Sequence, residues 1–213
     1  ACNGVGTPRL LLNSKSKSFP DGLANRSGLV GKNLMFHPLT GVAGVFNEPM
    51  LGHEGPMACS ILSQEFYETD TSRNFVRGYG LYSGRSTTPM TYALGGYGID
   101  DPIPWGEEHR KNMDTIYPYL AGLTVVTEDL PEESNCVTLD PYLTDSDGIP
   151  APKITYRLGD NTRKMLHHGE ERAKEVLLAA GAKTILEKGN DKVWWRAGWH
   201  QMGTCRMGNE ATK

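Results

Sequence analysis

One histidine near the end of the chain, His200, has surroundings that suit acid–base chemistry. It lies in the segment GWHQMGTCRMG, residues 198–208, close to Trp194, Trp195 and Trp199 and ahead of a Gly-Thr turn. A neutral imidazole among aromatic rings can take up a proton near pH 7, because the ordinary pKa of imidazole is close to that pH. A packed, hydrogen-bonded core histidine is the competing interpretation, and position and composition alone slightly favour it.

Three other groups of residues suggest chemistry less strongly. The glycines of residues 4–6 could bring backbone N–H groups to a phosphate, but the GxGxxG pattern is incomplete, and a tight strand-to-helix turn explains them more simply. His167 and His168 are adjacent and point in different directions on a helix, which favours surface or half-buried histidines over metal ligands. Cys205 could form a nucleophilic pair with His200, yet no third orienting residue is evident. The sequence therefore predicts no metal site.

The elements that must position these residues can be read from local patterns. Residues 7–12 predict a helix with Thr7 as its cap and a proline at its first position, and residues 13–33 predict a loop. Residues 40–46 and 74–82 resemble strands, and their glycines indicate bulges or close backbone approach. The start of the chain thus predicts a helix and a loop ahead of strands.

The later part of the chain has clearer periodicity. Residues 123–130 and 136–140 alternate in polarity around a turn-rich stretch, which predicts an antiparallel hairpin. Residues 153–158 alternate again and predict a further strand. Apolar residues then recur at helical spacing over 161–180, and a glycine follows as a stop signal. We therefore expect a mostly antiparallel sheet with a long helix laid across it.

Composition excludes several classes of function. The chain has 213 residues, a net charge of −3 and no dense block of Lys and Arg, so it lacks the basic surface of a nucleic-acid-binding protein. No apolar run approaches the roughly 20 residues that a membrane-spanning helix needs. Its four cysteines are far apart, which favours free or buried thiols over a disulfide framework. The composition is typical of an ordinary globular protein and not of a disordered one.

Three segments resemble signatures of the glucose–methanol–choline (GMC) flavin oxidoreductase family. Residues 199–208, WHQMGTCRMG, are similar to its HxxGTxRMG segment, residues 1–14 to its second signature, and residues 28–38, GLVGKNLMFHP, to its VGxNLxxHP segment. Residues 128–141 and 145–156 also resemble the branch with gluconate 2-dehydrogenase-like and sugar or polyol dehydrogenases. The segments follow the family's order, and the resemblance spans essentially the whole chain.

This resemblance implies an α+β fold: a mostly antiparallel sheet with helices packed on one face, plus small remnants of an α/β FAD domain. Residues 1–36 and 196–213 would be remnants of the FAD-binding domain, and residues 37–195 the substrate-binding domain. The family's GxGxxG segment does not occur in the sequence, nor does the later segment with a second active-site His or Asn. We therefore expect a fragment of a longer enzyme, inactive alone.

The resemblance also implies a mechanism. FAD would accept a hydride from a CH–OH group of a sugar, polyol or other alcohol, and His200, which matches the family's histidine, would take the hydroxyl proton. General-base catalysis of this kind contributes about 10²- to 10⁴-fold to the rate. Asn3, Gly4 and Asn33 would lie against the flavin.

The remaining expectations concern the substrate and the partners. Trp194, Trp195 and Trp199 would bind the substrate by ring stacking, although the same rings could simply form core. The enzyme would be a dehydrogenase or an oxidase, with oxygen, a quinone or a partner protein as its electron acceptor. The alternative hypothesis, from a different class, is a non-catalytic binding or interaction module that retains the GMC substrate-domain fold.

Overall fold

The computed structural model describes residues 3–55, 61–84, 88–95, 105–186 and 200–209. The chain divides into two compact units: unit 1 is Ala1–His37, Asp129–Gly159 and Gly198–Lys213, and unit 2 is Pro38–Glu128 and Asp160–Ala197. Residues 129–159, which we expected in the middle domain, group with the two ends of the chain. The assignment of the ends to an FAD-binding domain and of the middle to a substrate-binding domain stays a prediction.

Unit 2 is built on a five-stranded antiparallel sheet with the order β2-β3-β4-β1-β7. Its strands are β1 (Leu39–Val45), β2 (Ile61–Ser63), β3 (Tyr79–Gly84), β4 (Leu120–Thr127) and β7 (Thr184–Leu186). Strand β4 is central, and its register with β1 runs from Leu120 opposite Val45 to Val126 opposite Leu39. The antiparallel sheet predicted from the sequence is confirmed.

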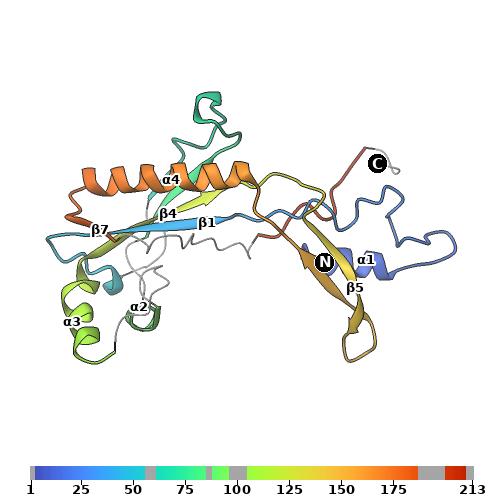
Figure 1. The fold of residues 1–213 in the computed structure, drawn as a ribbon, viewed down its shortest axis with the longest axis horizontal. Coiled ribbons are helices and arrows are strands. Elements are labelled where there is room, and N and C mark those ends of the chain that lie inside the picture. Colours follow the sequence, from blue (N-terminus) through green and yellow to red (C-terminus); the bar gives the residue numbers. More distant parts are fainter. Residues whose placement is uncertain (1–2, 56–60, 85–87, 96–104, 187–199, 210–213) are drawn as a thin grey trace. The chain divides into compact units, whose positions relative to one another are not determined.

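The long helix α4 (Asp160–Ala179) lies along this sheet (Figure 1). Its apolar residues recur at helical spacing, so one stripe of the helix is buried. Met165, Ala173 and Leu177 pack in one core cluster with strand residues such as Leu123 and Val125. The helix predicted over 161–180 is therefore confirmed, together with its packing on the sheet.

A second, smaller core cluster joins Ala43 and Leu120 of the sheet to Tyr92 and Tyr117. Tyr92 belongs to α2 (Pro89–Gly95) and Tyr117 to the 3₁₀ turn η3 (Tyr117–Tyr119), next to α3 (Glu107–Thr115). Ala43 follows Val42, a member of the α4 cluster, and successive strand residues point to opposite faces. The second cluster therefore covers the other face of the sheet. Two further 3₁₀ turns of unit 2 are η1 (Gly52–Glu54) and η2 (Thr71–Arg73).

Unit 1 consists of the helix α1 (Gly6–Asn13) packed on the antiparallel strands β5 (Cys136–Thr144) and β6 (Pro150–Thr155), with long loops. Arg9 ties the helix to the turn between these strands. Its Nη2 donates to Asp145 Oδ2 at 2.7 Å, and its Nε donates to the carbonyl oxygen of Pro150 at 2.8 Å. The bond from Arg9 also holds the pKa of Asp145 below its usual value.

The hairpin predicted between 123–130 and 136–140 is wrong. Both segments are strands, but β4 pairs with β1 and β3 in unit 2, whereas β5 pairs with β6 in unit 1. Alternating polarity shows which face of a strand is buried and does not show its partner. β4 lies inside the sheet of unit 2, so its backbone N–H and C=O groups need partners along both edges, and β1 and β3 supply them. Within the described residues, no helix combines the length and apolarity that a membrane span requires.

Candidate active site

In unit 1, the loop that follows His200 lies against the loop of residues 31–37. Met35 and Met202 form an antiparallel bridge in which each backbone N–H donates to the other residue's carbonyl, at 2.9 and 3.0 Å. A third backbone bond runs from the N–H of Gly31 to the carbonyl of Thr204 at 2.8 Å. These bonds fix the His200 loop against a segment more than 160 positions earlier in the sequence.

This close approach explains two residue types in the motifs. Gly203 has a φ of +92°, and an added Cβ would overlap with the carbonyl oxygen of Asn33, so no side chain fits there. Asn33 is itself buried, only 5% exposed, with a φ of +60°, a left-handed conformation that asparagine tolerates better than most residues. The Asn of one motif and the Gly of the other are thus paired by packing.

The N-terminal loop joins the same cluster. Asn3 Oδ1 accepts hydrogen bonds from the backbone N–H groups of Val5 at 3.0 Å and Gly6 at 2.7 Å, so Asn3 rather than Thr7 caps α1. The hydroxyl of buried Thr204 donates to the carbonyl oxygen of Gly4 at 2.7 Å. The structure therefore brings together the segments of Asn3, Gly4, Asn33 and His200. The role of the first three as flavin contacts stays a prediction.

His200 is exposed and has a φ of +56°, which is uncommon for a residue with a Cβ and typical of constrained functional positions. Its Nδ1 lies 2.9 Å from Nδ1 of His37, and the two rings meet edge to face at 78°, with centroids 5.0 Å apart. His37 is half-buried. Sequence reasoning missed His37 as a site residue, although the His-Pro of GLVGKNLMFHP was a signal.

The residue before His37 is held by a half-buried polar pair. The Tyr156 hydroxyl donates to Asp129 Oδ2 at 2.6 Å, and the backbone N–H of Phe36 points to the same oxygen at 3.5 Å. The rings of Phe36 and Tyr156 pack edge to face, with centroids 4.7 Å apart. Burial, and then the bond to Asp129, raise the pKa of Tyr156 well above its usual value, so its hydroxyl keeps its proton. This arrangement supports the backbone next to His37.

The other candidate residues have different surroundings. Trp194, Trp195 and Trp199 lie outside the described residues. His168 Nδ1 lies 2.8 Å from the hydroxyl of Tyr79 in the core of unit 2, and burial lowers its pKa. In the described part of the chain, no group of three or more His, Cys, Asp and Glu side chains could hold a metal ion. Cys205 is exposed as a residue, but desolvation around its thiol raises its pKa, which opposes a nucleophilic thiolate.

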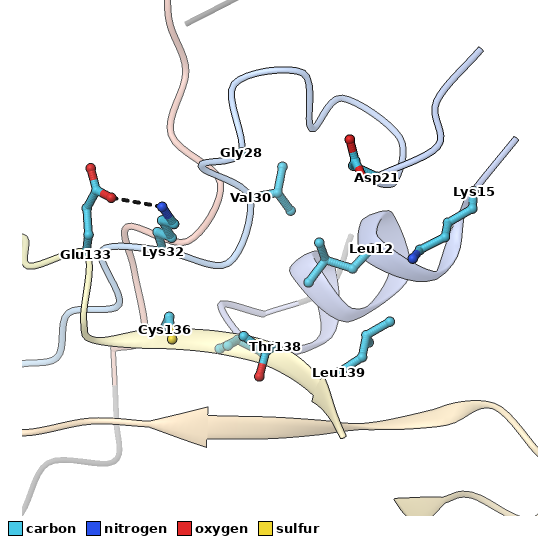
Figure 2. A pocket seen from close by; sticks show the side chains of 11 residues that line it. Leu12, Lys15, Asp21, Gly28, Val30, Lys32, Glu133, Cys136, Thr138 and Leu139 are labelled. Carbon is cyan, nitrogen blue, oxygen red and sulfur yellow. Dashed lines mark hydrogen bonds and ion pairs between the residues drawn. The ribbon is translucent and has the colours of Figure 1, made fainter. Parts of the chain in front are cut away.

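Unit 1 also contains an open groove of about 340 Å³ (Figure 2). Its walls include Leu12 of α1, Val30 and Val137, and its rim carries Lys32 and Glu133, which form an ion pair at 2.9 Å. The hydrogen bond from Lys32 lowers the pKa of the Glu133 carboxyl. Of the predicted site residues that the structure describes, His200, Asn3, Gly4 and Asn33, none lines this groove.

Comparison with known proteins identifies the family. Residues 131–213 match the family model described as GMC oxidoreductase. Over 212 residues, the chain is 42% identical to 2-methyl-1,2-propanediol dehydrogenase of Mycolicibacterium austroafricanum, a match that covers 98% of this chain and 38% of that protein. The chain belongs to the GMC oxidoreductase family. The family expected from the motifs is confirmed.

Two further relatives of this GMC chain carry related names. It is 29% identical over 191 residues to the fructose dehydrogenase large subunit of Gluconobacter japonicus, which covers 87% of this chain and 33% of the relative. It is 27% identical over 217 residues to paromamine 6'-oxidase of Streptomyces fradiae, and that match covers 99% of this chain and 35% of the relative. The chain thus spans between a third and two fifths of the length of these curated relatives.

Proposed function

We propose that this chain is part of a longer FAD-dependent GMC oxidoreductase that oxidises CH–OH groups of small alcohols, polyols or sugars, with His200 as general base. The observation that carries the proposal is the exposed ring of His200, which lies within the segment that matches the family model. Backbone hydrogen bonds hold the loop that follows His200, and His37 contacts the ring itself. The names of a diol dehydrogenase and a fructose dehydrogenase among the relatives support this substrate class.

The residues present fit the reacting edge of FAD rather than its nucleotide end. His200 offers an exposed ring, and its hydrogen bond uses Nδ1, so Nε2 is the nitrogen that can face a substrate. At Gly4, an added Cβ would meet the Cβ of Gln201 at 2.8 Å, so the space over this glycine is filled by the chain itself and leaves no phosphate cradle. We therefore propose that the nucleotide is held outside this chain, and that Asn3, Gly4 and Asn33 lie on the flavin side.

His200 would act on the substrate hydroxyl. Nε2 takes the hydroxyl proton, which leaves negative charge on oxygen and weakens the C–H bond at the carbinol carbon. FAD, when bound, would supply the hydride acceptor. Because the His200 backbone is fixed by the Met35–Met202 bridge and the Gly203 contact, the ring approaches the substrate with little loss of freedom.

The substrate would bind beside His200, and an external acceptor would take the electrons from the reduced flavin. Unit 2, with its antiparallel sheet, would carry most of the substrate-binding domain, and Trp194, Trp195 and Trp199 would stack on the substrate. A quinone or an electron-acceptor protein would reoxidise the flavin.

The test uses the flavin-loaded holoenzyme that contains this chain. Wild type, His200→Ala and the control His167→Ala, which changes an exposed histidine of α4, are compared with 2-methyl-1,2-propanediol, fructose and small alcohols in a dye-linked assay. We expect His200→Ala to keep its flavin and to lose about 10²- to 10⁴-fold in kcat, while the control stays near wild type. Turnover near wild type in His200→Ala would overturn the assignment of the base.

A further inference from the structure

The bond between His37 and His200 restricts where the protons of these two rings can lie. The two Nδ1 atoms are 2.9 Å apart, so one of them must donate and the other must accept. When both rings are neutral, each carries a single N–H. The pair therefore has two arrangements, and they differ in which nitrogen of His200 is free of a proton.

Only one arrangement leaves His200 competent as a base. If Nδ1–H of His200 donates to His37, then Nε2 of His200 carries a lone pair and can accept a proton. If instead Nδ1–H of His37 donates, the proton of His200 lies on Nε2, and that atom can accept nothing. A hydrogen bond to the second ring nitrogen is the usual way in which a protein sets a histidine tautomer.

We propose that His37 is a positioning residue, which accepts the hydrogen bond from Nδ1–H of His200 and so fixes the base-competent tautomer and ring orientation. The inference rests on His200 being the base under the proposed function. When Nε2 takes the substrate proton, the bond to His37 becomes charge-assisted and strengthens, and it stabilises the imidazolium as the positive charge forms.

The fold places these two residues opposite one another. Met35 and Met202 are a bridged antiparallel pair, so His37, two residues after Met35, faces His200, two residues before Met202. The backbone ahead of His37 is held through Phe36 by the Asp129–Tyr156 pair. Pro38 follows His37 and disfavours the helical conformation at His37. The contact is therefore set by register and by two neighbouring restraints.

Two substitutions of His37 separate the hydrogen bond from the packing. His37→Phe keeps a ring for the edge-to-face contact and removes the acceptor, whereas His37→Asn keeps an acceptor oxygen near the position of Nδ1. In the holoenzyme, with the best alcohol from the panel above, we expect His37→Phe to lower kcat about 10- to 100-fold and to leave KM and flavin content within about twofold. We expect His37→Asn to retain at least about a third of the wild-type kcat.

A spectroscopic measurement reads the tautomer without turnover. Nitrogen NMR of holoenzyme labelled with ¹⁵N-histidine, with the His200 signals assigned by their loss in His200→Ala, should show neutral His200 protonated at Nδ1 in wild type and shifted towards Nε2–H in His37→Phe. A wild-type His200 protonated at Nε2, or a wild-type kcat in His37→Phe, would overturn the role of His37. Retained turnover in His200→Ala would instead refute the proposed base, so the two failures can be told apart.

Discussion

Gly203 is the position at which one added methyl group should disturb the site most. Its φ of +92° is a conformation that alanine adopts only with strain, at a cost of about 1–2 kcal/mol. The new Cβ would also overlap with the backbone carbonyl of Asn33 and lie 2.9 Å from Cε of Met35. Because a backbone oxygen cannot rotate away, relief requires the loops to separate, at a further cost of about 1–3 kcal/mol. We expect Gly203→Ala to lower the free energy of unfolding by about 2–5 kcal/mol.

Gly148→Ala is the matched control. Gly148 lies in the turn between β5 and β6 of the same unit and has a φ of +76°, but nothing lies within 4 Å of its added Cβ. This control therefore carries the conformational strain without the overlap, and it should cost about 1–2 kcal/mol. Urea titrations of the 213-residue chain, followed by circular dichroism, compare the two variants. Equal losses of stability would refute the close docking of the His200 loop on Asn33.

Two further predictions concern the core of unit 2 and the cofactor. Burial lowers the pKa of His168 below 6.5, so the unfolded chain takes up this proton at a higher pH than the folded chain does, and the free energy of unfolding should fall as the pH drops below 6.5. His168→Gln should flatten this fall in pH-dependent urea titrations, and the exposed control His167→Gln should preserve it. The purified 213-residue chain alone should show no flavin absorbance and no dye-linked oxidation of alcohols, and stoichiometric FAD on it would contradict the view that the nucleotide is held elsewhere.

Local patterns were sufficient for much of the fold. The spacing of Met165, Ala173 and Leu177 predicts α4 within a residue of its observed ends, because a buried stripe repeats at the helical period. Partners that are distant in sequence were not accessible in this way. The pairing of β4 with β1 depends on segments about 80 residues apart, and alternation within β4 carries no information about them.

The same limit applies to the site. His200 and Asn33 could be proposed from the sequence because they stand in recognisable motifs. The contact between His200 and His37, by contrast, spans 163 positions and follows from the Met35–Met202 register. Thr7 was the expected cap of α1, but Asn3 takes that role, because its Oδ1 reaches two backbone N–H groups of the first turn. Short polar side chains compete for a helix start, and only the folded geometry decides between them.

The most direct test of the central claim is the rate of flavin reduction in a single anaerobic turnover. Wild-type holoenzyme and His200→Ala, both with full flavin content, are mixed with the best alcohol of the panel, and bleaching of the flavin absorbance is followed. His200 as general base predicts rapid bleaching in wild type and bleaching about 10²- to 10⁴-fold slower in the variant. Equal bleaching rates would contradict the account.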